Sequence, residues 1–438
     1  MHILAIDIGT SSVKAAVLDT ETATPVGTIA RGKYELRSPT PEASEVDPEV
    51  LWQCVMDTAR QAVWNTRESD AQIEGVGLSG LTPALVLLDK DDKPIMPIWS
   101  HLDRRSRPAA RMVWRSVGAP FLRTIGNRPL PGGISAVCVK QMLDTEYHLL
   151  HKIRSYLHVN GWVGFRLTGK KVFDPANASF TGLYETLGSR TWSQEWCDFF
   201  ELDIGWLPEI VSGETTIGSL RSDAAGELGV PPGIPVKIGS ADTSMAMLAV
   251  GMNANDVMHV VGTTQVLSVF VDNPTPTAYR LTRHFGFGDR MVQVTHNPLG
   301  GVSLDWIYSL CFRDQDKNTF FEQTIPKALD IPTKVVLDPP FLGGDRLQIE
   351  AHRASFRDMT INTDRMQVLS ALLHEMVRRH REALKALGMK KVTGKTFLTG
   401  GGSEVIRRII PEYQTQEIHD FEEGSLMGVA KLFRLPTS

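Results

Sequence analysis

Two stretches of this chain combine glycine with hydroxyl side chains in a spacing that suits phosphate groups. Gly9–Ser12 follows the apolar run Ile3–Ile6, and Gly262–Thr264 follows the apolar run Val257–Val261. Glycine lets the backbone approach phosphate oxygens closely, and successive N–H groups at a turn form an anion-binding nest. Each stretch is also followed by a β-rich run. The pattern predicts two strand–turn–strand hairpins whose tips hold phosphate.

One carboxylate distinguishes the first hairpin from the second. Asp7 precedes the first loop, whereas the aligned residue before the second loop is Val260. A single Gly-Thr turn between strands is more often a coincidence than a binding site. The repeat, Asp7 before the first loop and Lys14 after it favour two related domains that hold one polyphosphate from opposite sides. In that arrangement Asp7 is the carboxylate available to a metal ion.

A second carboxylate, Asp242, lies at a strand-to-helix junction. An expected strand at Val236–Gly239 precedes it, and the apolar residues Met245, Met247 and Leu248 after it fit a helix. Aspartate at such a place is a common helix N-cap. It is also well placed for chemistry, because ligands of open α/β sheets bind beside the carboxyl ends of the strands. The residues alone leave both interpretations open.

An aromatic residue and two charged residues at 99–105 could hold a sugar. Trp99 offers an apolar face, and Asp103 and Arg105 could hydrogen-bond hydroxyl groups. A surface loop with a salt bridge is an equally good interpretation of the same residues.

A triple glycine predicts a third loop that faces a nucleotide. The expected strand Lys395–Leu398 leads into Gly400–Gly402 and Ser403, and a helix is expected at 405–410. Strand, glycine loop and helix N-terminus together form an anion-binding arrangement. In the same half of the chain, a long helix is expected at about 364–387 and a loop at 341–346.

The length and composition fit a soluble globular protein of two or three domains. The chain has 438 residues, of which 42% are hydrophobic and 22% charged, and its net charge is −4. Nothing in this balance indicates nucleic acid or a membrane as a partner, and no secretory signal is visible. Four widely spaced cysteines indicate reduced thiols in the cytoplasm. Neither a Walker motif nor a GxGxxG fingerprint occurs, which disfavours P-loop NTPases and Rossmann dinucleotide sites.

These residues, jointly and in this order, resemble the FGGY carbohydrate kinases over almost the whole chain. The matched pieces are Ala5–Ser11 with Lys14, Trp99–Arg105, Leu167–Asp174, Gly239–Asp242, Val261–Thr264, Gly300–Gly301 and Gly400–Gly402. The resemblance implies an α/β, two-domain fold of the ribonuclease H-like (actin/hexokinase) type, with mixed central sheets and an interdomain cleft. The expected domains are 1–250, which binds the sugar, and 251–438, which binds the nucleotide.

The same resemblance implies ATP-dependent phosphorylation of a sugar or polyol hydroxyl, with Mg²⁺. Asp242 would be the general base and Asp7 the carboxylate on the magnesium side. The residues expected on the nucleotide side are Thr10, Ser11, Ser12, Lys14, Gly262, Thr263, Gly301, Gly401, Gly402 and Ser403. The residues expected on the acceptor side are Leu81, Thr82, Trp99, Asp103, Arg105 and Asp242. A homodimer is the candidate assembly.

Departures from the family pattern bear on the acceptor. Xylulokinases of the family carry a Met-His pair where this chain has Gly80–Pro83, and the Trp99-to-Asp103 spacing is one residue longer than usual. The chain therefore looks more like the compact ketose kinases. The expected acceptor is a ketose (a pentulose or heptulose) or a related polyol other than xylulose.

Two other classes of function share parts of this pattern. An actin- or chaperone-like ATPase would have both phosphate loops but no base at a sugar site. A non-catalytic sugar-binding regulator would have no need of Asp7 and Asp242, and the presence of both argues against it.

Overall fold

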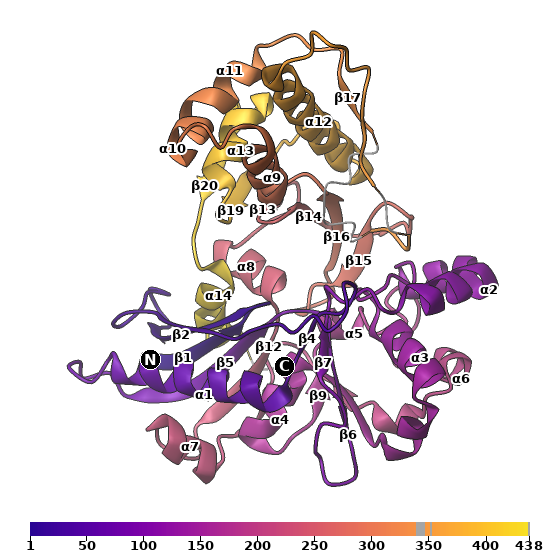
Figure 1. The fold of residues 1–438 in the computed structure, drawn as a ribbon. Coiled ribbons are helices and arrows are strands. Elements are labelled where there is room, and N and C mark those ends of the chain that lie inside the picture. The colour runs from indigo at the N-terminus through magenta and orange to yellow at the C-terminus, as the bar shows by residue number, and fades with distance from the viewer. Residues whose placement is uncertain (339–346, 351–352, 437–438) are drawn as a thin grey trace.

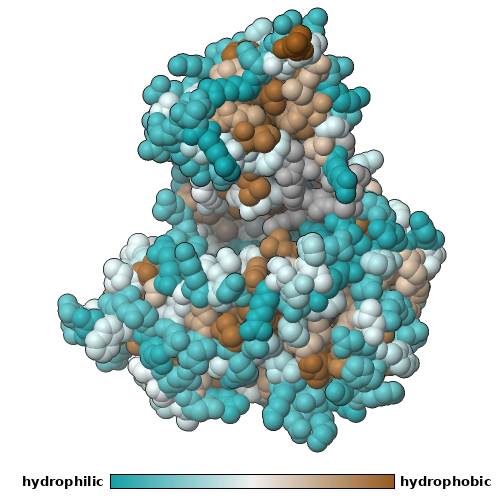
Figure 2. Space-filling model, viewed as in Figure 1, coloured by the Kyte–Doolittle hydropathy of each residue, from teal (hydrophilic) through white to brown (hydrophobic). Residues whose placement is uncertain are grey.

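The computed structural model describes residues 1–338, 347–350 and 353–436, and Figure 1 shows its fold. The loop expected at 341–346 lies outside the described residues. In the space-filling view a larger part and a smaller part meet at a narrow waist (Figure 2).

The larger part is built on a six-stranded mixed sheet with the order β11-β12-β5-β1-β2-β3. Its strands are β1 His2–Ile8, β2 Ser12–Asp19, β3 Ala30–Lys33, β5 Ile73–Gly80, β11 Thr216–Ser219 and β12 Pro235–Ala241. β1 pairs antiparallel with β2 and parallel with β5, and β5 pairs parallel with β12. Nearly every residue of β1 is buried, so helices cover both faces of this sheet.

The smaller part repeats this plan in a second six-stranded sheet, with the order β15-β16-β14-β13-β19-β20. Its strands are β13 Val257–Val261, β14 Gln265–Val271, β15 Leu281–His284, β16 Met291–Asn297, β19 Thr396–Thr399 and β20 Ile418–Asp420. β13 pairs antiparallel with β14 and parallel with β19, just as β1 pairs with β2 and β5. Both predicted hairpins, with their Gly-Thr loops at the tips, are therefore confirmed.

A four-stranded sheet with the order β4-β7-β6-β8 completes the larger part. Its strands are β4 Glu45–Val46, β6 Ala84–Leu88, β7 Ile98–Ser100 and β8 Ser155–His158. The remaining strands form two short pairs, β9 Val172–Phe173 with β10 Glu209–Ile210, and β17 Val336–Leu337 with β18 Phe356–Arg357.

Helices fill the connections between these strands. The larger part, called the first part from here on, contains α1 Pro48–Trp64, α2 Arg107–Ile125, α3 Ser135–Thr145, α4 Val159–Thr168, α5 Pro175–Ala178, α6 Gln194–Phe200, α7 Ser222–Leu228 and α8 Asp242–Val250. The smaller part, called the second part, contains α9 Gly301–Cys311, α10 Lys317–Thr319, α11 Ile325–Leu329, α12 Arg365–Ala386 and α13 Ser403–Ile409. Shorter helical turns lie at Tyr147–Lys152, Ile204–Trp206, Phe320–Thr324 and Pro411–Gln414. Within the described residues, every helix is too short or too polar to span a bilayer.

Local sequence signals explain where the helices α1 and α12 begin and where α12 ends. Asp47 caps α1 by accepting hydrogen bonds from the N–H groups of Glu49 and Val50, and Pro48 occupies the first turn. Asp364 caps α12 in a capping box with Gln367. Gly388 follows α12 with a φ of +79°, a conformation that ends a helix at little cost for glycine.

The last helix, α14 Gly424–Leu432, returns to the first sheet. It packs against α8 and against β1, β2 and β5, and Figure 1 shows it beside α8 above that sheet. Leu426, Val429 and Ala430 share a buried cluster with Ile3 and Met245. The expected division at residue 250 stays a prediction, and α14 lies with the first part although it falls within 251–438.

We expect the contact between α8 and α14 to tolerate no side chain at Gly428. A Cβ there would lie 2.1 Å from the carbonyl oxygen of Met245, so Gly428→Ala must push the two helices apart. Such overpacking should lower the free energy of unfolding by about 1–3 kcal/mol. Chemical denaturation of the purified variant measures this loss.

Gly226→Ala is the matched control. Gly226 also lies inside a helix, α7, but a Cβ added there would have no other atom within 4 Å among the described residues. Alanine favours helix by up to about 1 kcal/mol over glycine, so this variant should be at least as stable as the wild type. Equal stability of the Gly428 and Gly226 variants would show that the helix contact is not tight.

Candidate functional site

The turn at the tip of the first hairpin is held by two hydrogen bonds, and two of its backbone N–H groups are left free within the part of the chain that the structure describes. The N–H of Gly9 donates to the carbonyl of Ser12 at 2.9 Å, and the Tyr34 hydroxyl donates to the carbonyl of Gly9. The N–H groups of Thr10 and Ser11 donate to no acceptor among the described residues. A rigid turn with two free N–H groups is what an anionic oxygen needs.

The second hairpin has the same construction. The N–H of Gly262 donates to the carbonyl of Thr264, and the N–H of Gly301 donates to the carbonyl of Gly262, both at 2.9 Å. Gly262 and Thr263 are exposed. A Cβ on Gly300 would lie 2.5 Å from the carbonyl oxygen of Thr263, so only glycine lets α9 begin this close to the loop.

The triple glycine lies beside the same hairpin. Gly400 has a φ of +104°, and a Cβ there would lie 2.2 Å from the carbonyl oxygen of Val261. The N–H of Gly402 donates to that same oxygen at 3.3 Å, and Ser403 begins α13. A Cβ on Gly401, by contrast, would meet no described atom within 4 Å. The expected nucleotide-side residues of the second part therefore lie together around the end of β13, with open space at Gly401.

Lys14, which is also expected on the nucleotide side, is already engaged in an ion pair in this structure. Its Nζ donates to Oε2 of Glu423 at 2.7 Å, and Arg31 donates to the other oxygen of Glu423. Glu423 immediately precedes α14. Lys14 thus fastens the last helix to the first hairpin in this structure.

Asp7 is buried on β1 and bridged by two hydroxyls. Ser79 of β5 donates to its Oδ1 and Ser425 of α14 donates to its Oδ2, both at 2.7 Å. Burial raises the pKa of Asp7 to about 6, the nearby carboxylate of Asp242 also acts to raise it, and the two hydroxyls oppose that rise. Two carboxylates thus lie close enough to repel each other.

Asp242 is the first residue of α8 but does not cap it. Ala241 occupies the N-cap position and makes no side-chain capping bond, so the capping interpretation is wrong. Oδ1 of Asp242 accepts from the N–H of Thr243 at 2.6 Å and from its hydroxyl at 3.2 Å. Among the described residues nothing donates to Oδ2, which leaves that oxygen available to a ligand.

A cavity of about 250 Å³ joins Asp242 to the first phosphate loop. Its lining residues come from both parts of the molecule: Thr10, Leu81, Thr82, His101, Phe180, Asp242, Thr243, Val260, Val266, Ser268, Leu281, Arg283, Val294, Thr295, His296 and Leu347. The structure therefore brings Thr10, Leu81, Thr82 and Asp242 together. A cavity whose wall combines apolar side chains with convergent polar groups suits a small-molecule ligand.

The other three acceptor-side residues do not line this cavity. Asp103 is fully buried, and its Oδ2 accepts from Nε and Nη2 of Arg105 and from the N–H of Ser44. Arg105 also donates to Glu45 at 2.6 Å and stacks 3.9 Å above the ring of Trp99. Their polar groups are occupied by one another, and the expected acceptor contacts of Trp99, Asp103 and Arg105 stay predictions.

Three residues of the site escaped the sequence analysis. Ser79 lies near the end of β5 and pairs in register with Asp7, and its only signal in the sequence is that it follows the largely apolar stretch Val76–Leu78. Ser425 gave no signal, since it lies 418 positions from its partner Asp7. Arg283 gave none either, because only the pairing of β15 with β16 turns it toward the cavity.

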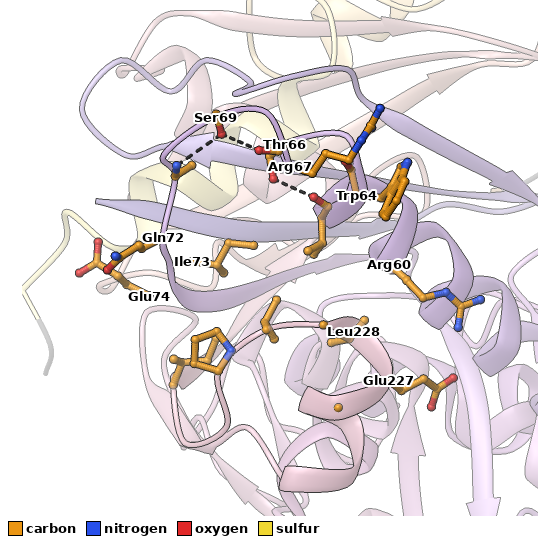
Figure 3. Close-up of a pocket in the computed structure, with 17 residues that line it drawn as sticks. Arg60, Trp64, Thr66, Arg67, Ser69, Gln72, Ile73, Glu74, Glu227 and Leu228 are labelled. Atoms are coloured by element: carbon orange, nitrogen blue, oxygen red, sulfur yellow. Dashed lines mark hydrogen bonds between the residues drawn. The ribbon is translucent and has the colours of Figure 1, made fainter.

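The largest cavity described, about 830 Å³, lies elsewhere (Figure 3). It lies where the end of α1, the start of β5 and α7 meet, and the side chains of Trp64, Arg67 and Glu227 border it. The hydroxyl of Ser69 in this cavity already donates a hydrogen bond to the nearby carbonyl of Thr66. None of the three glycine loops and neither acid of the site borders it, so it is not the candidate site.

Comparison with known proteins identifies the architecture. Residues 2–249 match the model for the N-terminal domain of the FGGY family of carbohydrate kinases. The putative sugar kinase YoaC of Bacillus subtilis is 28% identical over 282 residues, which are 63% of this chain and 55% of that protein. The L-xylulose/3-keto-L-gulonate kinase of Escherichia coli is 25% identical over 99% of this chain and 88% of that protein.

Solved structures give the same answer for the fold. The gluconate kinase of Lactobacillus acidophilus superimposes with a TM-score of 0.88 at 19% identity, covering 99% of this chain and 88% of that one. The xylulose kinase of the same organism gives a TM-score of 0.87 at 20% identity, with the same coverage. The predicted two-domain fold of the actin/hexokinase type is confirmed.

The burial of Asp7 predicts a pH-dependent stability. Between pH of about 4 and 6 the folded protein binds a proton at Asp7 that the unfolded chain has released, so stability falls as pH rises through this window. Asp7→Asn removes the buried charge and can keep both serine contacts. We expect the variant to be more stable than the wild type above pH 6, on the order of 2 kcal/mol, with the difference vanishing near pH 4.

Thermal melts at several pH values between 4 and 8, without nucleotide or metal, test this expectation. Ser425→Ala is the companion variant and should change stability in the opposite sense, because it removes a donor from the carboxylate. A difference between Asp7→Asn and the wild type that does not vary with pH would contradict the assignment of the effect to this charge.

Proposed function

The chain belongs to the FGGY family of carbohydrate kinases, and we propose that it transfers the γ-phosphoryl group of ATP to a hydroxyl of its acceptor with Asp242 as general base. It is a phosphotransferase, as the family implies. The observation that carries the proposal is the single cavity that joins Asp242 to Thr10 of the first phosphate loop.

The two hairpin tips would hold the triphosphate from opposite sides. Phosphoryl transfer requires neutralised charge and an in-line arrangement of attacking and leaving oxygens. The free N–H groups of Thr10 and Ser11 are available to phosphate on one side, and the exposed Gly262 and Thr263 are available on the other. The open space at Gly401, next to Gly402 and Ser403, is where the adenosine would lie.

The residues around Asp7 fit a magnesium ion. Asp7 and Asp242 repel each other, no lysine or arginine in the described part of the chain forms an ion pair with either, and carboxylate oxygens are ligands that Mg²⁺ prefers. The described residues contain no group of three or more metal-binding side chains, so phosphate oxygens and water would supply the remaining ligands. When bound, Mg²⁺ neutralises phosphate charge, and Asp7 would hold it.

The free oxygen of Asp242 suits proton removal. The acceptor hydroxyl would give its proton to Oδ2 of Asp242 as its oxygen bonds to the γ-phosphorus. The bond from that phosphorus to the bridging oxygen breaks at the same time, and ADP leaves with the electron pair. The hydrogen bonds from Thr243 to Oδ1 fix the orientation of the carboxylate.

The acceptor is expected to have the carbon skeleton of a ketose or a related polyol. Leu81 and Thr82, which stand where xylulokinases carry Met-His, line the cavity beside Asp242. A ketose other than xylulose is therefore our proposal for the skeleton. A cytoplasmic location and a homodimer also stay predictions.

ATP turnover that depends on an acceptor tests the function directly. We expect ADP release to require both Mg²⁺ and a polyhydroxylated acceptor, measured in a coupled assay over ketopentoses, ketoheptoses, alditols and sugar acids. Equal ADP release with and without every acceptor would identify an ATPase of the same fold instead.

Asp242→Asn separates catalysis from structure. Asparagine keeps the shape of the side chain but cannot accept the proton, so kcat should fall by roughly 10²–10⁴. Melting temperature and nucleotide affinity should remain close to those of the wild type, because Ala241 and not Asp242 occupies the N-cap.

Asp47→Asn is the matched control, since Asp47 caps α1 and does not line the cavity. Asparagine caps about as well as aspartate, so this variant should keep full activity. An Asp242→Asn enzyme within a few-fold of the wild-type kcat would remove Asp242 as the base.

A further inference from the structure

The acceptor cavity contains a buried arginine that forms no ion pair with any described residue. Arg283 of β15 is 1% exposed and lines the cavity with Asp242. Its Nη1 donates to Oγ of Ser244 and, at 3.3 Å, to the carbonyl of His284. Among the described residues its Nη2 has no hydrogen-bond partner, and no ion pair includes Arg283.

Burying this guanidinium is energetically unfavourable for the protein when no ligand is bound. A guanidinium is always charged near neutral pH, and burying a charge without a partner is strongly unfavourable. Burial lowers the pKa of Arg283 to about 10, although Asp242 and Asp174 oppose this fall from a distance. The arginine therefore remains a cation with an unused donor in the wall of the cavity.

The strand register places Arg283 away from the Gly262 turn of the second phosphate loop. Three cross-strand rows line this face of the second sheet, beginning with Val266 and His296 beside the Gly262 turn. The next row is Ser268, Val294 and Leu281, and the third is Phe270, Val292 and Arg283. The four residue steps from Val266 to Phe270 span roughly 13 Å. A ligand group on Arg283 thus lies well away from a phosphate at the Gly262 turn.

Two hydroxyls accompany the free donor of Arg283. Oγ of Ser268 and Oγ1 of Thr82 are also buried without hydrogen-bond partners among the described residues, and both residues line the same cavity. The rest of the wall includes apolar side chains such as Leu81, Phe180 and Leu281. Buried polar groups without a partner in a cavity wall mark the places where a ligand can supply the missing hydrogen bonds.

We propose that the acceptor is a polyhydroxy acid whose carboxylate pairs with Arg283, while a hydroxyl elsewhere on the molecule faces Asp242. The inference rests on the kinase function proposed above and names the substrate class of that same site. A carboxylate satisfies the free Nη2 and the buried charge together, which a neutral hydroxyl cannot do. A keto acid would combine this group with the ketose skeleton.

A different role for Arg283 would be to act on Asp242 alone. In that role the arginine would hold the base charged and oriented, and its loss would lower kcat for every acceptor alike. Recognition of a carboxylate instead predicts a loss confined to acidic acceptors and expressed mainly in KM. The two roles therefore differ in a measurable way.

The wild-type protein should first be assayed with Mg²⁺ and ATP on pairs of acceptors that differ only at one end. Suitable pairs are five- and six-carbon aldonates against the corresponding alditols, and 2-keto acids against the corresponding ketoses. We expect the best acid to exceed its neutral partner in kcat/KM by on the order of 10²-fold. This comparison needs no variant and does not depend on one that folds.

Arg283→Gln should then lose that preference. Its KM for the acid should rise by on the order of 10²-fold, while kcat/KM for the neutral partner should change by less than a few-fold. Arg283→Lys keeps the charge and should retain part of the preference. Arg280→Gln, a neighbouring arginine that does not line the cavity, should behave as the wild type.

Three results would overturn the proposal. A neutral ketose or alditol as the best wild-type acceptor would reject the acid class and leave the kinase function standing. An equal fall in kcat for all acceptors in folded Arg283→Gln would assign Arg283 to the positioning of Asp242. ADP release that no acceptor stimulates would reject the kinase function itself, and the acidic acceptor with it.

Discussion

The buried carboxylate of Asp7 is the constraint on which the rest of the site depends. Desolvation and the neighbouring Asp242 both disfavour its charge, and hydroxyls from β5 and α14 oppose that cost. The protein thus keeps an unfavourable charge at the place where a cation and phosphate would relieve it. Strain of this kind is common at functional sites, where stability is given up for binding. It also explains why the last helix returns to the first sheet, since α14 supplies Ser425.

The two parts of the molecule carry two copies of one hairpin that differ in a single chemically important residue. β1–β2 and β13–β14 have the same pairing, and each ends in a glycine turn whose N–H groups are free or exposed. Asp7 has no acidic counterpart in the second copy, where Val260 joins the wall of the cavity instead. One copy therefore carries the carboxylate proposed to hold a metal, and the other carries an apolar side chain at the same position.

Local signals were enough to predict the hairpins and the long helix α12. In each case neighbouring residues carry the information: a strand, a glycine turn, a helix start. The sequence alone could not predict the contacts that join distant segments. Trp99, Asp103 and Arg105 have the residue types of a sugar site, but Glu45 and Ser44 from another segment occupy their polar groups. Arg283 lay unnoticed for the same reason, because strand register alone decides which face of β15 it occupies.

Both parts of the molecule contribute side chains to the cavity wall, and this bears on how the hydrolysis of ATP by water could be limited. Leu81, Thr82 and Asp242 belong to the first part, whereas Ser268, Leu281 and Arg283 belong to the second. An acceptor that fills this cavity must contact both parts, so its binding energy is available to hold them together. The two hairpin tips proposed to hold the triphosphate are carried by the same two parts. Under the proposed function, acceptor binding would favour the alignment of phosphate with Asp242 and would displace competing water. Catalysis and acceptor recognition would then be joined, because the second sheet would contribute to both.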